Sequence, residues 1–287
     1  MNVSSSIPSW TLRHHSFDWG TRTYLMGILN VTPDSFSDGG RFNSLETALA
    51  QAHRLVEAGI DILDIGGQST RPQAHEITEA EELDRVIPIV EAIRSERPVP
   101  ISVDTTRASV AAAAIAAGAD LVNDVSGGVQ DAQMLSTVAQ LGVPIILMHR
   151  RGTPQTMQQM TDYENLVEDI IDFLRQQIEA ALAAGIPHDQ IAIDPGIGFA
   201  KTGPQNLELL RQMSRFQALG HPLLVGPSRK SFIGQILNQP DPQKRVWGTA
   251  AACCAAIQGG ADILRIHDGA AISEVSQVAD AIWRSRP

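Results

Sequence analysis

Eight short apolar segments, each followed by a longer segment with a helical pattern, constrain this chain more than any other feature. Such runs, rich in Ile, Leu and Val, are typical of strands buried on both faces. They lie at residues 25–31, 61–65, 100–104, 120–125, 144–149, 190–195, 222–226 and 262–267. Helices are predicted near residues 45–58, 78–96, 107–117, 131–141, 163–184, 205–218, 243–258 and 270–284.

Boundary signals support this alternation. Asn43 with Glu46, and Thr78 with Glu81, have the spacing of helix capping boxes. Glycines follow most of the predicted helices, at positions 59, 118, 142, 185, 220 and 259. Eight strand–helix units in series predict an α/β fold, a closed (β/α)8 TIM barrel; an open doubly wound sheet is the alternative.

No linker or low-complexity stretch divides the chain, so we expect one domain over residues 1–287. Residues 1–24 stand outside the repeat as an N-terminal extension. The segment FDWGTRTY, residues 17–24, is interpreted as a small hairpin able to plug the amino end of the barrel.

Composition narrows the range of partners. The 287 residues suffice for one barrel of about 250 residues. A net charge of −10 argues against nucleic acid or an anionic membrane as a partner, although a few local cations can still bind a small anion. No apolar run approaches the roughly 20 residues of a membrane span, and no secretory signal is recognised. Cys253 and Cys254 are neighbours in a helical pattern and predict buried, unbridged thiols in a reducing, cytoplasmic compartment.

Every apolar run ends in a polar residue. In a parallel barrel these ends gather on one face, where such folds place their chemistry. A single polar strand end is explained by capping or turn formation, but eight at one edge predict a site. They are Asn30, Asp64, Asp104, Asn123, His149, Asp194, Ser228 and His267.

Arg265 and His267 lie two residues apart on the last strand, so both side chains face the mouth of the barrel. A guanidinium beside an imidazole suits phosphate; the alternative is an internal ion pair between Arg265 and a nearby Asp. Asn30 offers a neutral oxygen that a hard cation such as Mg²⁺ would join to phosphate oxygens.

Carboxylates and an amide form a second set, Asp104, Asn123 and Asp194. A carboxylate accepts two parallel hydrogen bonds from a guanidine-like edge, and an amide both donates and accepts. These groups therefore suit a flat heterocycle with an aminopyrimidinone edge.

Two loops complete the predicted site. The segment GPSRKS, residues 226–231, places Gly226, Ser228 and Lys230 after a buried strand, where backbone N–H groups can bind an anion; a solvated Arg-Lys pair is the alternative. Arg71 lies on a long polar loop that we expect to be mobile. Residues 149–151 either border the site or are charged residues on the surface of a loop. The motifs GxSxG and GxGxxG are absent.

Ordered motifs over about residues 17–284 resemble those of the dihydropteroate synthases, pterin-binding enzymes of folate biosynthesis. The motifs are LMGILNVTPDSFSDGG (25–40), GGQSTRP (66–72), SVDT (102–105), NDVSG (123–127), LMH (147–149), DPGIGFAK (194–201), LLVGPSRKSFIG (223–234) and RIHD (265–268).

The resemblance implies a transferase that joins 6-hydroxymethyl-7,8-dihydropterin diphosphate to p-aminobenzoate with Mg²⁺ as cofactor, and we expect a homodimer. It further implies which residues act. Asp104, Asn123, Asp194 and Lys230 would hold the pterin, and Asn30 the metal. Thr70, Arg265 and His267 would hold the diphosphate, with Arg71, Phe199, Ser228 and Lys230 near p-aminobenzoate. Gly226 is included among the substrate-binding residues, and Asp104, Lys230, Arg265 and His267 are the predicted catalytic set.

Three residues depart from the family pattern: Gln68 replaces a common Glu, Gln73 a common Gly, and Arg150 a common Met. Gln68 and Gln73 are expected to alter the charge and mobility of the second loop, and Arg150 the rim of the site. The rival activity is that of a corrinoid-linked methyltransferase acting on methyltetrahydrofolate, which would not need Arg265 and His267. The alternative that is not an enzyme is a catalytically silent binding protein.

Overall fold

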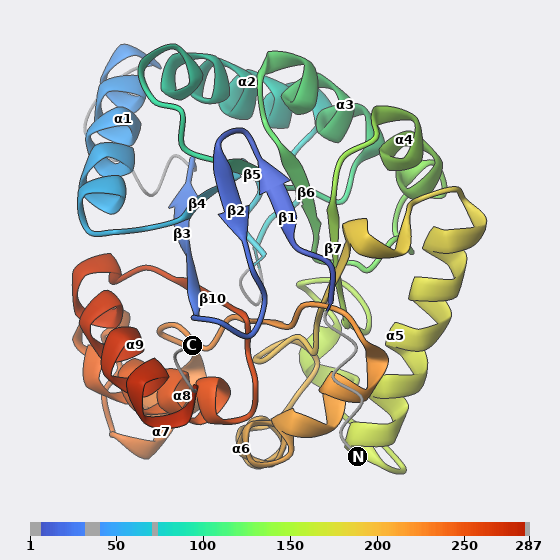
Figure 1. Ribbon diagram of the computed structural model, residues 1–287, viewed down its shortest axis with the longest axis vertical. Coiled ribbons are helices and arrows are strands. Elements are labelled where there is room, and N and C mark those ends of the chain that lie inside the picture. Colours follow the sequence, from blue (N-terminus) through green and yellow to red (C-terminus); the bar gives the residue numbers. More distant parts are fainter. Residues whose placement is uncertain (1–6, 32–40, 71–73, 285–287) are drawn as a thin grey trace.

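Eight parallel strands form the barrel in the computed structural model, which describes residues 7–31, 41–70 and 74–284 (Figure 1). The strand order is β8-β7-β6-β5-β4-β3-β10-β9, and β9 meets β8 through one parallel bridge between Ile193 and Leu223. This bridge closes the sheet, so the barrel is confirmed over the open sheet. The strands are β3 Tyr24–Asn30, β4 Ile62–Gly66, β5 Ile101–Asp104, β6 Leu121–Asp124, β7 Ile145–Met148, β8 Ile191–Asp194, β9 Leu224–Val225 and β10 Ile263–Ile266.

Helices surround the barrel, as Figure 1 shows, and join successive strands. They are α1 Arg41–Glu57, α2 Glu79–Glu96, α3 Ala108–Ala117, α4 Met134–Leu141, α5 Leu166–Ala183, α6 Gly203–Arg211, α7 Ser231–Ile236, α8 Val246–Gln258 and α9 Gly269–Trp283. Short 3-10 turns lie at Met157–Gln159, His188–Gln190, Met213–Leu219 and Pro242–Lys244. Among the helices of the described ranges, none has the length and apolarity that crossing a bilayer demands.

Some of the helix boundaries predicted from the sequence are confirmed, and one is wrong. The Thr78 hydroxyl accepts from Glu81 N at 3.2 Å and the Glu81 carboxylate accepts from Thr78 N at 2.9 Å, which confirms this capping box. Gly118 and Gly142 end their helices in the left-handed conformation. The capping role predicted for Asn43 is wrong, because α1 begins at Arg41 and already includes it.

An antiparallel hairpin, β1 Trp10–Leu12 and β2 His15–Phe17, lies across one end of the barrel (Figure 1). The predicted hairpin at residues 17–24 is therefore displaced: this segment turns at residues 18–21 and leads into β3. The reason is that the apolar side chains suited to the base of the barrel lie at residues 10–17, before the predicted turn. Trp10, Leu12 and Phe17 pack there against inward-facing side chains of seven strands: Met26, Ile62, Leu121, Ile146, Ala192, Leu224 and Ile263.

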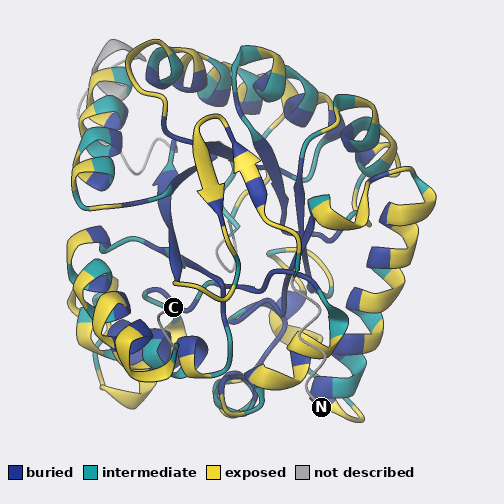
Figure 2. Ribbon diagram, viewed as in Figure 1, coloured by how far each residue is buried: buried dark blue, intermediate teal, exposed yellow. Residues whose placement is uncertain are grey.

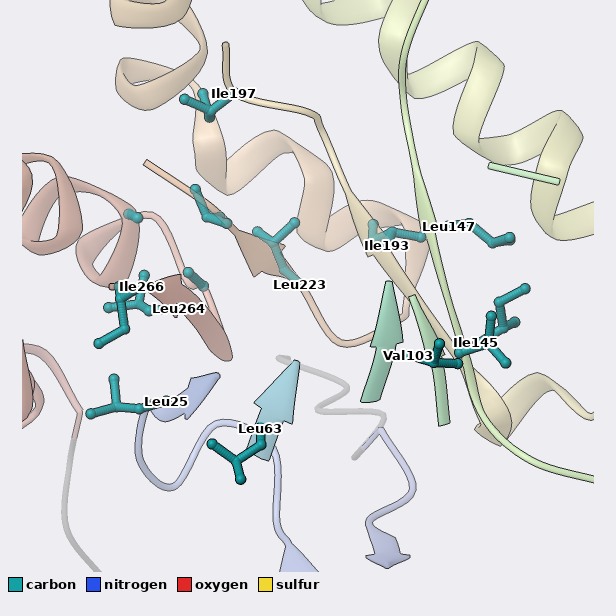
Figure 3. Packing of buried hydrophobic residues seen from close by; sticks show 14 of the residues in the cluster. Leu25, Leu63, Val103, Ile145, Leu147, Ile193, Ile197, Leu223, Leu264 and Ile266 are labelled. Atoms are coloured by element: carbon teal, nitrogen blue, oxygen red, sulfur yellow. The ribbon is translucent and has the colours of Figure 1, made fainter. Parts of the chain in front are cut away.

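The larger part of the core lies outside the barrel wall. Side chains such as Leu25, Leu63 and Leu264 point from the strands toward the helices (Figure 3). Figure 2 shows buried strands at the centre and helices whose outer faces are exposed. Because both faces of the sheet are covered, the strands read as the near-continuous apolar runs of the sequence.

Candidate active site

Inward-facing positions of the barrel change from apolar at the base to polar at the carboxyl ends of the strands. Side chains two residues apart on a strand share a face. The change occurs in one step along four of the strands, and it gathers their polar ends at the mouth. The steps run from Ile62 to Asp64, Leu121 to Asn123, Ala192 to Asp194, and Ile263 to Arg265 and His267.

A cavity of about 380 Å³ opens at this mouth. Its wall is built from the ends of β3 and β10 and from the loops after β4, β8 and β9. The structure thus brings together most of the residues predicted to bind substrate or metal. They are Asn30, Thr70, Phe199, Gly226, Ser228, Lys230, Arg265 and His267.

The three residues predicted for the heterocycle lie deeper. Asp104, Asn123 and Asp194 are all buried at the ends of β5, β6 and β8, and the wall of the main cavity does not include them. Asp104 instead borders, with Thr70, an adjoining cavity of about 40 Å³. The predicted site therefore has two adjoining parts. The cationic chamber is the cavity lined by Lys230, Arg265 and His267, and the buried acidic floor is formed by Asp104, Asn123 and Asp194.

Arg265 joins the chamber to the floor. Its Nε donates to Asp64 Oδ2 and its Nη2 to Asp104 Oδ2, each at 2.6 Å. Asn123 Nδ2 donates to the same Asp64 oxygen at 3.2 Å. The internal ion pair considered as the alternative for Arg265 is thus present, while the guanidinium also lines the cavity.

Burial raises the pKa of the Asp104 carboxyl to about 7; Arg265 opposes this rise, and the carboxylates of Asp64 and Glu82 add to it. Burial alone would lower the pKa of Arg265, but Asp64 and Asp104 outweigh it and raise that pKa. The guanidinium therefore remains a permanent cation, whereas Asp104 ionises near neutrality.

His267 is oriented by Ser228 across β10 and the loop after β9. The Ser228 hydroxyl lies 2.9 Å from His267 Nδ1 and accepts from His267 N at 3.2 Å. A hydroxyl that accepts the backbone N–H can give its own hydrogen to Nδ1. The neutral imidazole then carries its hydrogen on Nε2.

The loop after β9 is held by Arg245, which also lines the cavity. Arg245 donates to the carbonyls of Arg229 at 2.9 Å and Pro240 at 2.6 Å. Arg229 pairs with Asp268, so one of the two predicted loop cations is an internal ion pair. Lys230 is placed differently: its Nζ lies 4.1 Å from the centre of the Phe199 ring, and both residues face the cavity.

Asp194 sits under the loop that carries Phe199. Its Oδ1 accepts from Gly196 N at 2.7 Å. Burial raises the pKa of Asp194 to about 6, and the Gly196 N–H, Lys230, Lys201 and Arg265 oppose the rise. An anionic acceptor of this kind suits the N–H edge predicted from the sequence.

Two of the three residues that depart from the family pattern, Gln68 and Arg150, lie in the described part of the chain. The Gln68 amide donates to Ser69 O at 2.9 Å and His75 O at 2.8 Å and accepts from Ile77 N at 2.8 Å, which orders the loop that carries Thr70. A Glu at this position has no hydrogen to donate. Gln73, Arg71 and the loop 32–40 lie outside the described residues.

His149 and Arg150 are both buried, so the interpretation of them as surface charge is wrong. Arg150 borders the smaller cavity beside Asp104, and its Nη2 donates to Gln130 Oε1 at 2.5 Å. His149 contacts Lys201 instead, through Nδ1 at 3.0 Å. Arg151 is the residue of this trio that reaches outward, stacking over Tyr163 at 3.8 Å.

Asp64 and Lys201 take part in the site although neither is among the predicted substrate-binding or catalytic residues. Asp64 is fully buried, and its Oδ2 accepts hydrogen bonds from Arg265 and Asn123. Among the residues that the structure describes, its Oδ1 has no hydrogen-bond partner. Its position at a polar strand end was visible in the sequence. The burial of Lys201 was not, because it depends on how the loop after β8 folds back.

The residues at the mouth fit a magnesium ion that is shared with substrate. Within the described residues no three His, Cys, Asp or Glu side chains gather as a metal site. Asn30 nevertheless brings an amide oxygen to the cavity that also holds Arg265 and His267. Mg²⁺ commonly takes few protein oxygens and completes its shell with phosphate and water, so a single Asn beside a cationic phosphate pocket is a compatible donor set.

Comparison with known proteins agrees with this geometry. The family model for pterin binding enzymes matches residues 26–267. A dihydropteroate synthase of Synechocystis sp. is 59% identical over 268 residues, 93% of each chain. The Yersinia pestis dihydropteroate synthase, solved as a sulfonamide drug complex, has a TM-score of 0.90 and 44% identity, covering 96% of this chain and 99% of that one.

The Xanthomonas albilineans dihydropteroate synthase in complex with 7,8-dihydropteroate has a TM-score of 0.86 and 40% identity, covering 96% of this chain and 98% of that one. These relatives favour dihydropteroate synthesis over the methyl transfer considered as its rival. A full-length match at such identity, on a barrel whose mouth has the expected polar residues, places the chain in the pterin-binding enzyme family, with the dihydropteroate synthases.

Proposed function

We propose that the mouth of this barrel condenses 6-hydroxymethyl-7,8-dihydropterin diphosphate with p-aminobenzoate, giving 7,8-dihydropteroate and diphosphate. The observation that carries the proposal is the Arg265 ion pair. It places a permanent cation between the chamber and a floor of buried carboxylates. A substrate with an anionic end and a flat hydrogen-bonding end matches this division.

The pterin ring belongs on the acidic floor. Asp194 would accept two N–H groups of its aminopyrimidinone edge, and Asn123 would both donate and accept. Asp104 would lie closest to the methylene carbon, where positive charge develops as the carbon–oxygen bond breaks. A carboxylate near that carbon lowers the energy of the transition state.

The diphosphate belongs in the chamber. As the bond between the methylene carbon and the ester oxygen breaks, its electron pair moves to the diphosphate. Arg265 and the His267 imidazole would stabilise that charge, with Thr70 and Lys230 beside them. Asn30 would hold Mg²⁺ there, and the ion, when bound, supplies further positive charge to the leaving group.

The p-aminobenzoate amine would then attack the methylene carbon from the side of Phe199 and Lys230. Its lone pair forms the new carbon–nitrogen bond, and the nitrogen loses one proton to solvent. A neutral amine facing a strongly activated carbon needs little help from a general base. Ser228 would complete this side of the proposed site, to which the family resemblance also assigns Arg71.

A coupled assay of diphosphate release tests the function. Release that requires both p-aminobenzoate and the pterin diphosphate, with 7,8-dihydropteroate as the product, supports the proposal. Release that is independent of p-aminobenzoate would mean hydrolysis, and transfer of a methyl group from methyltetrahydrofolate would support the rival. Pterin binding without turnover would indicate a silent binding protein.

We further propose that two copies of the chain associate through the face formed by α6, α7 and α8. An apolar groove of about 590 Å³ lies there, lined by side chains that include Leu210, Phe232 and Ile236. Ile236 is 62% exposed and nearby Trp247 is 76% exposed. Large apolar side chains that are exposed together mark interaction surfaces.

Sedimentation of Trp247→Glu and Ile236→Glu tests the dimer. Each substitution should shift the protein toward a monomer, whereas Leu182→Glu, a change at an exposed residue of α5, should not. A wild-type protein that sediments as a monomer at micromolar concentration would rule the dimer out. We also propose a cytoplasmic location, as expected from the sequence; Cys253 is buried and Cys254 half-buried.

A further inference from the structure

Lys201 is a buried lysine beside the proposed pterin site, and none of the steps of the proposed reaction uses it. It is 3% exposed. Its Nζ donates to Phe199 O at 2.8 Å and lies 3.0 Å from His149 Nδ1. Both partners are neutral, so they do not offset the cost of removing an ammonium from water. A charge placed so deeply calls for an opposite charge nearby.

Asp194 provides that opposite charge. The Gly196 N–H donates to Asp194 Oδ1 at 2.7 Å. Lys201 Nζ lies 3.4 Å from the point where a Cβ on Gly196 would stand. The ammonium and the carboxylate therefore flank the same glycine. Gly196 has a φ of +72°, and an added Cβ would stand 2.0 Å from His149 O, so no other residue fits there.

The same lysine holds the loop that presents Phe199. This loop turns through left-handed conformations at Gly198 and Ala200. At Ala200, which carries a Cβ, that conformation is strained and is kept by the surrounding contacts. Lys201 folds back onto the Phe199 carbonyl, and the Tyr163 hydroxyl donates to Ala200 O at 2.9 Å. The Phe199 ring then lies against Lys230 at the cavity.

We propose that Lys201 is a positioning residue of the synthase reaction: its buried ammonium keeps Asp194 anionic for the pterin and fixes the loop that carries Phe199. The inference rests on the proposed function, since it assigns Lys201 to the pterin half of that site. His149 acts as the neutral acceptor that lets the ammonium stay buried.

The charged groups around this pair are consistent with such a role. Lys230 opposes the rise in the Asp194 pKa more than Lys201 does, and Arg265 opposes it less; of the three, Lys201 also donates to the Phe199 carbonyl of the loop. Burial lowers the pKa of Lys201 to about 7; Asp194 opposes this, while Lys230 and Arg151 lower it further. Burial also holds the pKa of His149 at about 2, with Lys201 and Arg151 contributing, so the imidazole stays neutral. Lys201 is thus still charged over the range in which Asp194 ionises.

Calorimetric titration with free pterin from pH 5 to pH 7.5 tests the proposal. Wild-type affinity should rise with pH to a plateau with a midpoint near the pKa of Asp194, about 6. Lys201→Met should move this midpoint up by about one pH unit. That corresponds to roughly fivefold weaker binding at pH 6 and convergence with wild type at higher pH.

Three further variants separate charge from packing. Lys201→Gln is neutral but keeps a donor for the Phe199 carbonyl, so it should show the raised midpoint even if Lys201→Met fails to fold. Lys201→Arg keeps the charge and should restore the wild-type midpoint. Tyr163→Phe removes the hydrogen bond to Ala200 O of this loop and should leave the midpoint in place.

A wild-type midpoint in Lys201→Gln would overturn the proposal, even if its affinity were lower at every pH. The outcome is distinct from failure of the proposed function, which would appear in the wild-type protein as no pterin binding and no diphosphate release.

Discussion

Arg265 Nη2 donates to Asp104 Oδ2 at 2.6 Å, and this ion pair links β10 to β5 across the mouth of the barrel. Carboxylates from two other strands fix the Arg265 guanidinium at the cavity. A cation placed before the substrate arrives needs no reorganisation when charge develops on the leaving group, which is the condition for strong electrostatic catalysis.

Replacing Arg265 by Ala should reduce kcat/KM for the pterin diphosphate by about 30- to 1000-fold, or about 2–4 kcal/mol of transition-state stabilisation. Diphosphate release measured over a range of substrate concentrations gives the loss. Arg22→Ala is the matched control, since Arg22 also pairs with an Asp, namely Asp61, but near the base of the barrel. Wild-type turnover in Arg265→Ala would remove Arg265 from the reaction.

Asp194→Asn keeps the size of the side chain but exchanges an acceptor for a donor, which opposes the N–H edge of a pterin. Free pterin should bind more weakly by about 1–3 kcal/mol, as measured by calorimetry at pH 7. Asp189→Asn, at an exposed residue just before the same strand, should bind pterin as the wild type does. Equal affinity in Asp194→Asn and wild type would place the pterin elsewhere.

Ser228→Ala should lower kcat while leaving the fold intact, because the hydroxyl that orients the His267 imidazole is lost. One such hydrogen bond is worth about 1 kcal/mol, or roughly fivefold in rate. Steady-state kinetics of diphosphate release measure the change, and Ser136→Ala on α4 serves as the control. An unchanged kcat would show that His267 does not depend on Ser228.

His149 should make the protein sensitive to acid. Its pKa in the folded state is about 2, below its ordinary value of 6.5, so between these values the unfolded chain binds more protons. Its contribution to the free energy of unfolding is therefore complete above pH 6.5 and is lost as pH falls, by up to about 1.4 kcal/mol per pH unit.

His149→Asn removes this titration and keeps an acceptor for Lys201. The free energy of unfolding, measured by urea denaturation from pH 7 to pH 4, should fall less steeply for His149→Asn than for wild type. His14→Asn, at an exposed position, should follow the wild-type slope. Parallel slopes for wild type and His149→Asn would mean that His149 is not buried as a neutral imidazole.

The barrel, and the gathering of polar residues at one of its ends, could be predicted from the amino-acid sequence. Periodic alternation of apolar runs and helical patterns is a local property, and a parallel barrel necessarily brings the polar strand ends together. For this reason the pattern alone assigns Asn30, Ser228 and His267 to one mouth, and all three line the same cavity in the folded chain. The capping box at Thr78 was equally local.

Which of these polar groups pair with one another could not be predicted, because the pairing depends on how distant segments meet in the fold. The partners of Arg265 are 161 and 201 residues away in the chain, and no spacing rule relates them. Burial was just as inaccessible: Lys201 and His149 are ordinary in sequence, and their pKa values change because the folded loop and α5 exclude water around them. The position of the hairpin, too, depended on which apolar side chains fill the base of the barrel. Pairing and desolvation act between segments that are distant in the chain, so they exist only once the chain has folded.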